Sequence, residues 1–245
     1  MKRQIPNLIT LCNLLCGILA SWVAVRGRLD IAAYLILLGI VFDFFDGLAA
    51  RLLHVSSPLG KELDSLADVV TSGVAPGFIF MSILWHADWG AGALVALLIP
   101  LFAAYRLAKF NIDTRQSHSF IGLPVPSNAL IWVAMGIAFS DNAALRFSVL
   151  PTQWLADFCF DGVGLFVLLA VELVGCVLMV SEVPLFGLKF KNLSWHDNKL
   201  QFLFLGVDVL LLVLLGIMAF PIIILWYIVL SLCCYKALPS DEASK

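Results

Sequence analysis

Apolar residues follow one another in this chain over stretches that are too long for the core-facing segments of a water-soluble domain. Several of these stretches reach the roughly 20 residues that an α-helix needs to cross the bilayer core. We predict eight spans, at residues 6–26, 31–52, 61–85, 91–112, 124–140, 163–183, 202–219 and 221–237. The pattern therefore predicts an all-α, multi-pass transmembrane helical bundle.

Nothing in the apolar pattern divides the chain into separate domains. We expect residues 1–240 to form one integral-membrane domain, because no repeat, linker or low-complexity tract interrupts them, and residues 241–245 to form a frayed tail. The first stretch follows Met1-Lys2-Arg3 and could be read as a cleaved signal peptide. Asn7, Thr10 and Asn13 interrupt its apolar run, so we expect it to be retained as the first span.

Composition and charge support this interpretation and indicate an orientation. Hydrophobic residues make up 62% of the 245 residues and charged residues only 13%. Lys and Arg near span ends prefer the cytoplasmic side, and their distribution predicts a cytoplasmic N-terminus. On that side would lie Lys2, Arg3, Arg51, Lys61, Arg106, Lys109, Arg115, Lys189, Lys191, Lys199, Lys236 and Lys245, against Arg26, Arg28 and Arg146 outside. A net charge of −2 without a basic arm argues against a nucleic-acid partner.

Four aspartates interrupt the apolar pattern near the end of the second span and in the third. The run reads Asp43-x2-Asp46-Gly47-x2-Ala50-Arg51-x8-Gly60-x3-Asp64-x3-Asp68. One charged side chain at the bilayer centre costs roughly 2.5 to 3.5 kcal/mol on insertion scales. Four of them close together require a compensating partner.

Helix geometry places these aspartates on facing surfaces of a hairpin. Asp43 lies eight residues before Arg51 and Asp68 eight residues after Gly60, which puts both about 12 Å inside the connecting loop at 1.5 Å per residue. Asp46 and Asp64 come about half as deep, so we expect two layers with one carboxylate from each helix. Asp64 and Asp68 are spaced at i and i+4, and therefore share one face of their helix.

Carboxylates arranged in this way are suited to divalent cations. Hard oxygen ligands bind Mg²⁺, Mn²⁺ or Ca²⁺, and two such ions can hold a diphosphate and stabilise its leaving oxygen. Gly47, Ala50 and Gly60 remove side-chain bulk and would open a polar pocket, and the Arg51 guanidinium can fork onto phosphate oxygens. In the alternative, the aspartates are rim residues paired with bases such as Arg51 and Lys61.

The complete run resembles the signature of the CDP-alcohol phosphotransferase family. The resemblance implies that the aspartates bind two divalent cations, Mg²⁺ or Mn²⁺, that hold the diphosphate of a CDP-linked donor. The metal ligands would be Asp43, Asp46, Asp64 and Asp68. Asp68 would also be the catalytic base that takes the proton of the acceptor hydroxyl. The CDP pocket would include Gly47, Ala50, Arg51, Gly60 and Asp64. The resemblance further implies a homodimer.

Three other segments resemble the phosphatidylserine synthase branch of this family, at residues 6–13, at 106–111 followed by 120–126, and at 181–191. That branch converts CDP-diacylglycerol and L-serine to phosphatidylserine and CMP. With the N-terminus in the cytoplasm, the aspartates lie about two helical turns below the cytoplasmic surface, so we expect an active site on the cytoplasmic side of the cell (inner) membrane. Asn7 and Thr10 either cap the first helix or contact the donor. Arg106 and Lys109 either anchor a span end or bind the serine carboxylate or a donor phosphate.

Other functions remain open at this point. Another acceptor, such as glycerol 3-phosphate or inositol phosphate, would call for further cationic side chains, which Arg106 and Lys109 could supply. An intramembrane prenyltransferase would carry its acidic clusters on two distant helices, and a cation transporter would more often show repeated halves and broken helices. Glu172 and Asp208 are intramembrane acids outside the motif, with either a structural or a functional role.

Overall fold

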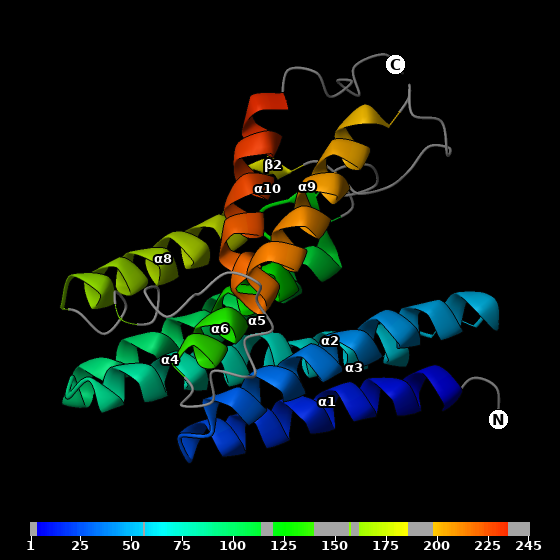
Figure 1. Ribbon diagram of the computed structural model, residues 1–245. Coiled ribbons are helices and arrows are strands. Elements are labelled where there is room, and N and C mark those ends of the chain that lie inside the picture. The colour runs from blue at the N-terminus through cyan, green and yellow to red at the C-terminus, as the bar shows by residue number, and fades with distance from the viewer. Residues whose placement is uncertain are drawn as a thin grey trace.

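The computed structural model describes residues 4–55, 57–113, 120–139, 157, 162–185 and 198–234. Helices dominate this part of the chain (Figure 1). Six of them are long and apolar enough to cross a membrane: Gln4–Val25, Leu29–Leu52, Pro58–His86, Gly90–Ile112, Gly162–Val180 and Lys199–Cys233. Val125–Ala138 is a shorter apolar helix. The prediction of an all-α, multi-pass membrane bundle is confirmed.

Several of these spans consist of more than one regular segment. The first two are α1 (Gln4–Val25) and α2 (Leu29–Leu52), the third contains α3 (Pro58–Asp68), η1 (Val69–Val74) and α4 (Ala75–His86), and the fourth contains η2 (Gly90–Leu97) and α5 (Leu98–Ile112). Next come α6 (Val125–Ala138), α8 (Gly162–Val180), α9 (Lys199–Leu215), η4 (Gly216–Ala219) and α10 (Phe220–Cys234). Two short strands, β1 (Phe120–Ile121) and β2 (Pro184–Leu185), pair in antiparallel orientation.

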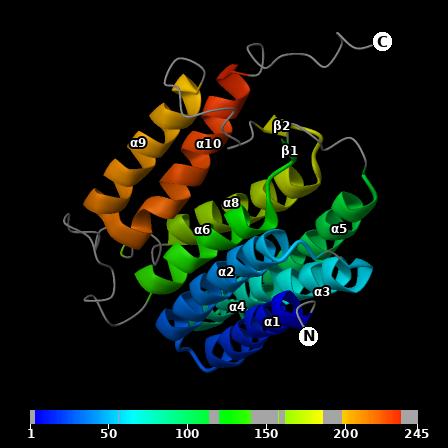
Figure 2. The ribbon, with the colours of Figure 1, turned by 90° about the vertical axis from the view of Figure 1, so that its right-hand side faces the viewer.

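Three predicted spans differ from the observed helices. The span expected at 124–140 is α6, which has 14 residues and is therefore only about 21 Å long at 1.5 Å per residue. The last two predicted spans are one apolar stretch that turns back at Gly216, so that α9 and α10 lie side by side (Figures 1 and 2). Gly216 has φ 57°, a left-handed conformation that glycine adopts without a steric penalty.

The bundle is densely packed around α6 and open around α9. Of the 14 residues of α6, 11 are buried, because α2, α4 and α10 all pack against it. In α9, by contrast, Phe204 is the one buried residue. Figure 2 shows α1 to α4 gathered on one side of the bundle and the α9–α10 hairpin on the other.

The third span changes its helical form directly after Asp68. Its start is fixed by Pro58 in the first turn and by the Ser57 Oγ, which accepts a hydrogen bond of 2.9 Å from the Gly60 N–H. Pro76 has no N–H and cannot bond to the carbonyl one turn before it. The preceding segment, Val69–Val74, is a π-helix, a form that often accompanies such an interruption.

Small residues allow the π-helix to pack closely against the first two helices. A Cβ on Gly39 of α2 would lie 2.5 Å from the Thr71 Cγ2, and a Cβ on Gly17 of α1 would collide with Thr71 as well. Such close approach between backbones is typical of small residues at membrane helix interfaces. The packing holds α1, α2 and the end of α3 together at the depth of the predicted site.

Candidate active site

Three of the four aspartates converge between α2 and α3. One carboxylate oxygen from each of Asp43, Asp64 and Asp68 lies within 4.8 Å of the other two. Asp64 and Asp68 are one helical turn apart on α3, and Asp43 faces them from α2. The Asp64 Oδ1 is buried and has no hydrogen-bond partner in the described part of the chain. A buried oxygen without a donor, next to two further carboxylates, is suited to a cation.

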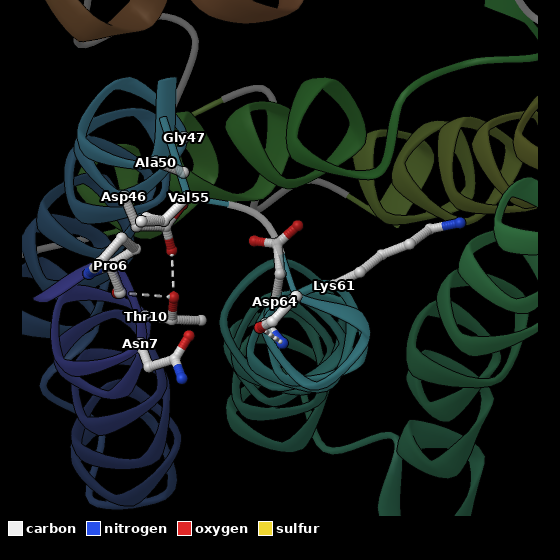
Figure 3. A pocket seen from close by; sticks show the side chains of 11 residues that line it. Pro6, Asn7, Thr10, Asp46, Gly47, Ala50, Val55, Lys61 and Asp64 are labelled. Carbon is white, nitrogen blue, oxygen red and sulfur yellow. Dashed lines mark hydrogen bonds between the residues drawn. The ribbon is translucent and has the colours of Figure 1, made fainter. Parts of the chain in front are cut away.

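The Asp46 side chain accepts a hydrogen bond from α1, a helix outside the predicted hairpin of α2 and α3. Its side chain is 6% exposed, and its Oδ2 accepts a hydrogen bond of 2.5 Å from the Thr10 Oγ1 (Figure 3). The same hydroxyl lies 3.0 Å from the Pro6 carbonyl oxygen. The expectation of two equal layers is therefore incomplete, because Asp64 joins the deeper pair and α1 supplies the neighbour of Asp46.

Asp68 also has a partner on α1. The Asn13 Nδ2 donates a hydrogen bond of 3.2 Å to the Asp68 Oδ1, and the Thr71 Oγ1 donates one of 3.0 Å to the Asn13 carbonyl oxygen. Asn13 was not among the predicted site residues. Its spacing from Thr10 was the available signal, because residues at i and i+3 share a helix face. Its contact with Asp68 could not be read from the sequence.

A pocket of about 270 Å³ opens beside Asp46 and Asp64. Its lining comes from α1, α2, α3 and the loop before α3: Pro6, Asn7, Thr10, Asp46, Gly47, Ala50, Val55, Ser57, Gly60, Lys61 and Asp64. The structure thus gathers most of the predicted donor-site residues around one cavity (Figure 3). A Cβ on Gly47 would meet nothing within 4 Å, so this glycine leaves open space. Pro6, Val55, Ser57 and Lys61 were not predicted to belong to the site.

Arg51 is the one residue predicted for the CDP pocket that does not line this cavity. Its side chain is exposed, and its Nε donates a hydrogen bond of 3.0 Å to the Gly47 carbonyl oxygen one turn earlier on α2. Lys61 does line the pocket, with its Nζ 3.0 Å from the Asn111 carbonyl oxygen. Within the described residues neither base forms an ion pair with an aspartate. The described residues thus do not show the pairing that the alternative of rim acids neutralised by local bases requires.

Arg106 and Lys109 lie outside the 270 Å³ pocket. They line a separate cavity of about 10 Å³ between the end of α5 and the end of α8. Arg106 is only 6% exposed, its guanidinium carbon lies 4.9 Å from the centre of the Phe110 ring, and its Nε has no hydrogen-bond partner in the described chain. The Lys109 Nζ lies 3.6 Å from the Glu182 Oε1. Most of the third serine-branch segment, at residues 186–191, lies outside the described residues.

A polar contact connects this end of α5 with the aspartate helix. The Asn111 Nδ2 donates a hydrogen bond of 2.9 Å to the Ser65 Oγ, next to Asp64 in sequence. Together with the Lys61 contact to the Asn111 carbonyl, it holds the start of α3 against the end of α5. The segment with Arg106 and Lys109 is therefore fixed relative to the aspartates without sharing their pocket.

Glu172 and Asp208 are not part of the pocket either. Glu172 on α8 is 1% exposed, and neither of its carboxylate oxygens has a hydrogen-bond partner in the described chain. The Asp208 Oδ1 on α9 is also buried without a partner there. These three oxygens therefore differ, within the described chain, from those of Asp46 and Asp68 that accept hydrogen bonds from α1.

Fold and site together define a polytopic membrane protein with an acidic pocket formed by its first three spans. Residues 3–159 match the CDP-alcohol phosphatidyltransferase family. Because this match covers more than half of the chain, the protein belongs to that family, as its aspartate run predicts. The matched residues include all of α1, α2 and α3, and therefore all four aspartates.

Several relatives within this family have names that specify a reaction. The chain is 38% identical over 138 residues to a CDP-diacylglycerol–serine O-phosphatidyltransferase of Bacillus subtilis, covering 56% of this chain and 78% of that protein. A protein of the same name from Helicobacter pylori is 38% identical over 130 residues, covering 52% of this chain but only 55% of the relative. One from Mycobacterium bovis is 26% identical over 242 residues, with 94% and 76% covered.

Proposed function

We propose that this chain is a membrane phosphatidyltransferase that converts CDP-diacylglycerol and L-serine to phosphatidylserine and CMP with two divalent metal ions. The observation that carries the proposal is the convergence of Asp43, Asp64 and Asp68, whose oxygens lie within 4.8 Å of one another. Family membership supports the CDP-linked donor, and the names of the relatives support serine as the acceptor.

The donor set fits divalent cations of the hard type. Carboxylates at this spacing repel one another when ionised, and no basic side chain in the described chain neutralises them. We assign Asp43, Asp46, Asp64 and Asp68 to two ions, Mg²⁺ or Mn²⁺, while Ca²⁺ fits the same oxygen chemistry. When bound, such ions neutralise the diphosphate and stabilise its leaving oxygen.

The reaction requires one proton acceptor, and we assign that role to Asp68. The serine hydroxyl oxygen forms a bond to the phosphorus that carries diacylglycerol, and the bond from this phosphorus to the oxygen of the cytidylyl phosphate breaks. CMP leaves with that oxygen, and the hydroxyl proton passes to Asp68. Asp68 is 9% exposed and its Oδ1 is held by Asn13, which fixes the direction of the carboxylate.

The 270 Å³ pocket would hold the CDP part of the donor. Gly47, Ala50 and Gly60 leave room there, and the polar side chains of Asn7 and Thr10 point toward it (Figure 3). Arg51 is exposed and one turn from the pocket, so its guanidinium can leave the Gly47 carbonyl and bind a phosphate.

The donor headgroup would reach this pocket from the cytoplasm, with the lipid tails in the bilayer. The charge distribution that predicts a cytoplasmic N-terminus supports this orientation and a location in the cell (inner) membrane. The homodimer and the single domain over residues 1–240 remain predictions.

One observation is compatible with a second candidate, in which the acceptor carries a phosphate. Arg106 is a buried cation whose Nε has no hydrogen-bond partner in the described chain, and Lys109 lies close by. These side chains could bind the carboxylate of serine or the phosphate of glycerol 3-phosphate or inositol phosphate equally well.

Acceptor competition on purified protein tests both candidates. CDP-diacylglycerol in detergent micelles is supplied with Mn²⁺ or Mg²⁺ and one of the three acceptors, and CMP release and the lipid product are measured. We expect metal-dependent CMP release with serine and phosphatidylserine as the product. Release with a phosphorylated acceptor alone would favour the second candidate, and no release with any alcohol would contradict both. The Asp43→Asn variant is the control for release that does not depend on the site.

A further inference from the structure

Asn13 is the most completely buried polar side chain that contacts the aspartate cluster. It is 0% exposed and sits in α1, where Cys16 and Gly17 continue the same buried face of the helix. Its Nδ2 donates to the Asp68 Oδ1 at 3.2 Å. An ionised Asp68 gains from this donor because a hydrogen bond to a charged acceptor is stronger than one to a neutral acceptor. The contact occupies one Asp68 oxygen and leaves the other for the reaction.

The surroundings of Asn13 hold its side chain in place. The Thr71 Oγ1 donates to the Asn13 main-chain oxygen at 3.0 Å, which ties α1 to the π-helix that follows Asp68. On the other side, a Cβ on Gly39 would lie 2.9 Å from the Asn13 Oδ1. The side chain therefore stands between α2 and α3, one helical turn along α2 from Asp43. Little space remains there for another rotamer.

A role in packing alone does not account for an amide at this position. The Asn13 Oδ1 is buried and has no hydrogen-bond partner in the described chain. A buried polar atom without a partner lowers stability, whereas leucine, which has a similar shape, would fill the space without that penalty. The amide thus carries a stability cost that its contact with Asp68 can explain.

We infer that Asn13 is a positioning residue, which orients the Asp68 carboxylate so that its second oxygen faces the acceptor hydroxyl. The inference rests on the proposed function, because it requires Asp68 to act as the base. Asn13 itself touches neither substrate nor reacting atoms in this role. It acts through Asp68, and losing it should lower the rate of transfer more than it lowers the binding of donor or metal.

Two substitutions of similar size test this role. Asn13→Leu removes the donor, and Asn13→Asp replaces it with an acceptor facing Asp68. We expect kcat for CMP release to fall by about 100-fold in both, the loss that a small misplacement of a catalytic group can cause. The KM for CDP-diacylglycerol and the Mn²⁺ concentration at half-maximal rate should change far less, because all four aspartates that hold the ions are still present.

Cys16→Ala is the matched control, since Cys16 is buried on the same face of α1 and lines no part of the pocket. It should retain wild-type kcat, whereas an equal loss there would show that packing alone is responsible. Wild-type kcat in Asn13→Leu would also overturn the inference.

Combination with Asp68→Asn separates the two proposals and does not depend on one variant alone. If Asn13 acts through Asp68, Asn13→Leu should cause no further loss of residual transfer in the Asp68→Asn background. An additive loss would overturn the inference. Full activity of Asp68→Asn by itself would contradict the proposed function, whatever the Asn13 variants do.

Thr71→Val removes the hydroxyl that donates to the Asn13 carbonyl and repeats the test if the Asn13 variants fail to fold. An unchanged kcat in Thr71→Val would count against the inference.

Discussion

The intramembrane acids of this protein occupy two different environments. In the first three spans, Asp46 and Asp68 each accept a hydrogen bond from α1, and Asp43, Asp64 and Asp68 share a cluster. On α8 and α9, both oxygens of Glu172 and the Oδ1 of Asp208 are buried and have no hydrogen-bond partner in the described chain. Burial of a carboxyl group therefore does not indicate a site by itself. What distinguishes the first region is convergence of several acids with polar side chains that orient them.

We expect the largest effect on turnover when the proposed base, Asp68, is replaced. Asp68→Asn should lower turnover by about 10²- to 10⁴-fold, the range that a general base contributes, while largely retaining donor binding. Asp43→Asn and Asp46→Asn should weaken metal binding and donor affinity as well, because holding the ions is the only role assigned to these two side chains. Turnover, CDP-diacylglycerol affinity and Mn²⁺ dependence are measured for all three variants. An equal loss of donor affinity in all three would contradict a separate role for Asp68.

The close packing behind the site should also be sensitive to added bulk. Gly39→Ala would place a Cβ 2.5 Å from the Thr71 Cγ2, and we expect it to destabilise the protein by about 1–3 kcal/mol, as overpacking does. Gly206→Ala on α9 is the matched control, because its Cβ would meet nothing within 4 Å. Thermal unfolding in detergent compares the two. A stability loss that is as large at Gly206 would remove the distinction between the two regions.

A smaller effect is expected where α1 holds Asp46. Thr10→Val keeps the shape of the side chain but removes the hydroxyl, and a hydrogen bond to a charged group contributes about 1.5–3 kcal/mol. We expect the Mn²⁺ concentration at half-maximal rate to rise by about tenfold, which corresponds to 1.4 kcal/mol. Thr10→Ser retains the hydroxyl and should behave like the wild type. An unchanged metal requirement in Thr10→Val would show that this contact does not support the site.

The smallest effect on turnover is expected at Glu172. Glu172→Gln and Glu172→Leu should both retain wild-type CMP release, because this acid lies outside the pocket and has no partner in the described chain. Glu172→Leu should raise stability by about 1–3 kcal/mol, since it removes buried polar oxygens without hydrogen bonds. Rates and unfolding temperatures are measured together. Loss of turnover with unchanged folding would give Glu172 a functional role, and the acids on α8 and α9 would then no longer differ in function from those of the first three spans.

The fold shows where an apolar pattern is sufficient for a prediction and where it is not. The first four predicted spans coincide closely with helices, because their ends are marked by charged or polar residues such as Arg26 and Lys61. The break between the last two spans was predicted near residue 220, and Gly216 supplies it with a positive φ. The span predicted at 124–140 has 17 residues, whereas α6 has 14 and ends at Ala138, so the sequence pattern located this short helix but misplaced its ends by one or two residues.

The sequence by itself determined that four aspartates lie on facing surfaces of one hairpin, because helical periodicity fixes which residues share a face and depth. It also determined the family, since the residue types and their spacing along one hairpin carry that signature. Only the tertiary structure decided which other helix completes the site. Asn13 and Thr10 reach the aspartates because Gly17 and Gly39 let α1, α2 and the π-helix approach closely. Contacts of this kind depend on the relative rotation of packed helices, which no local pattern specifies.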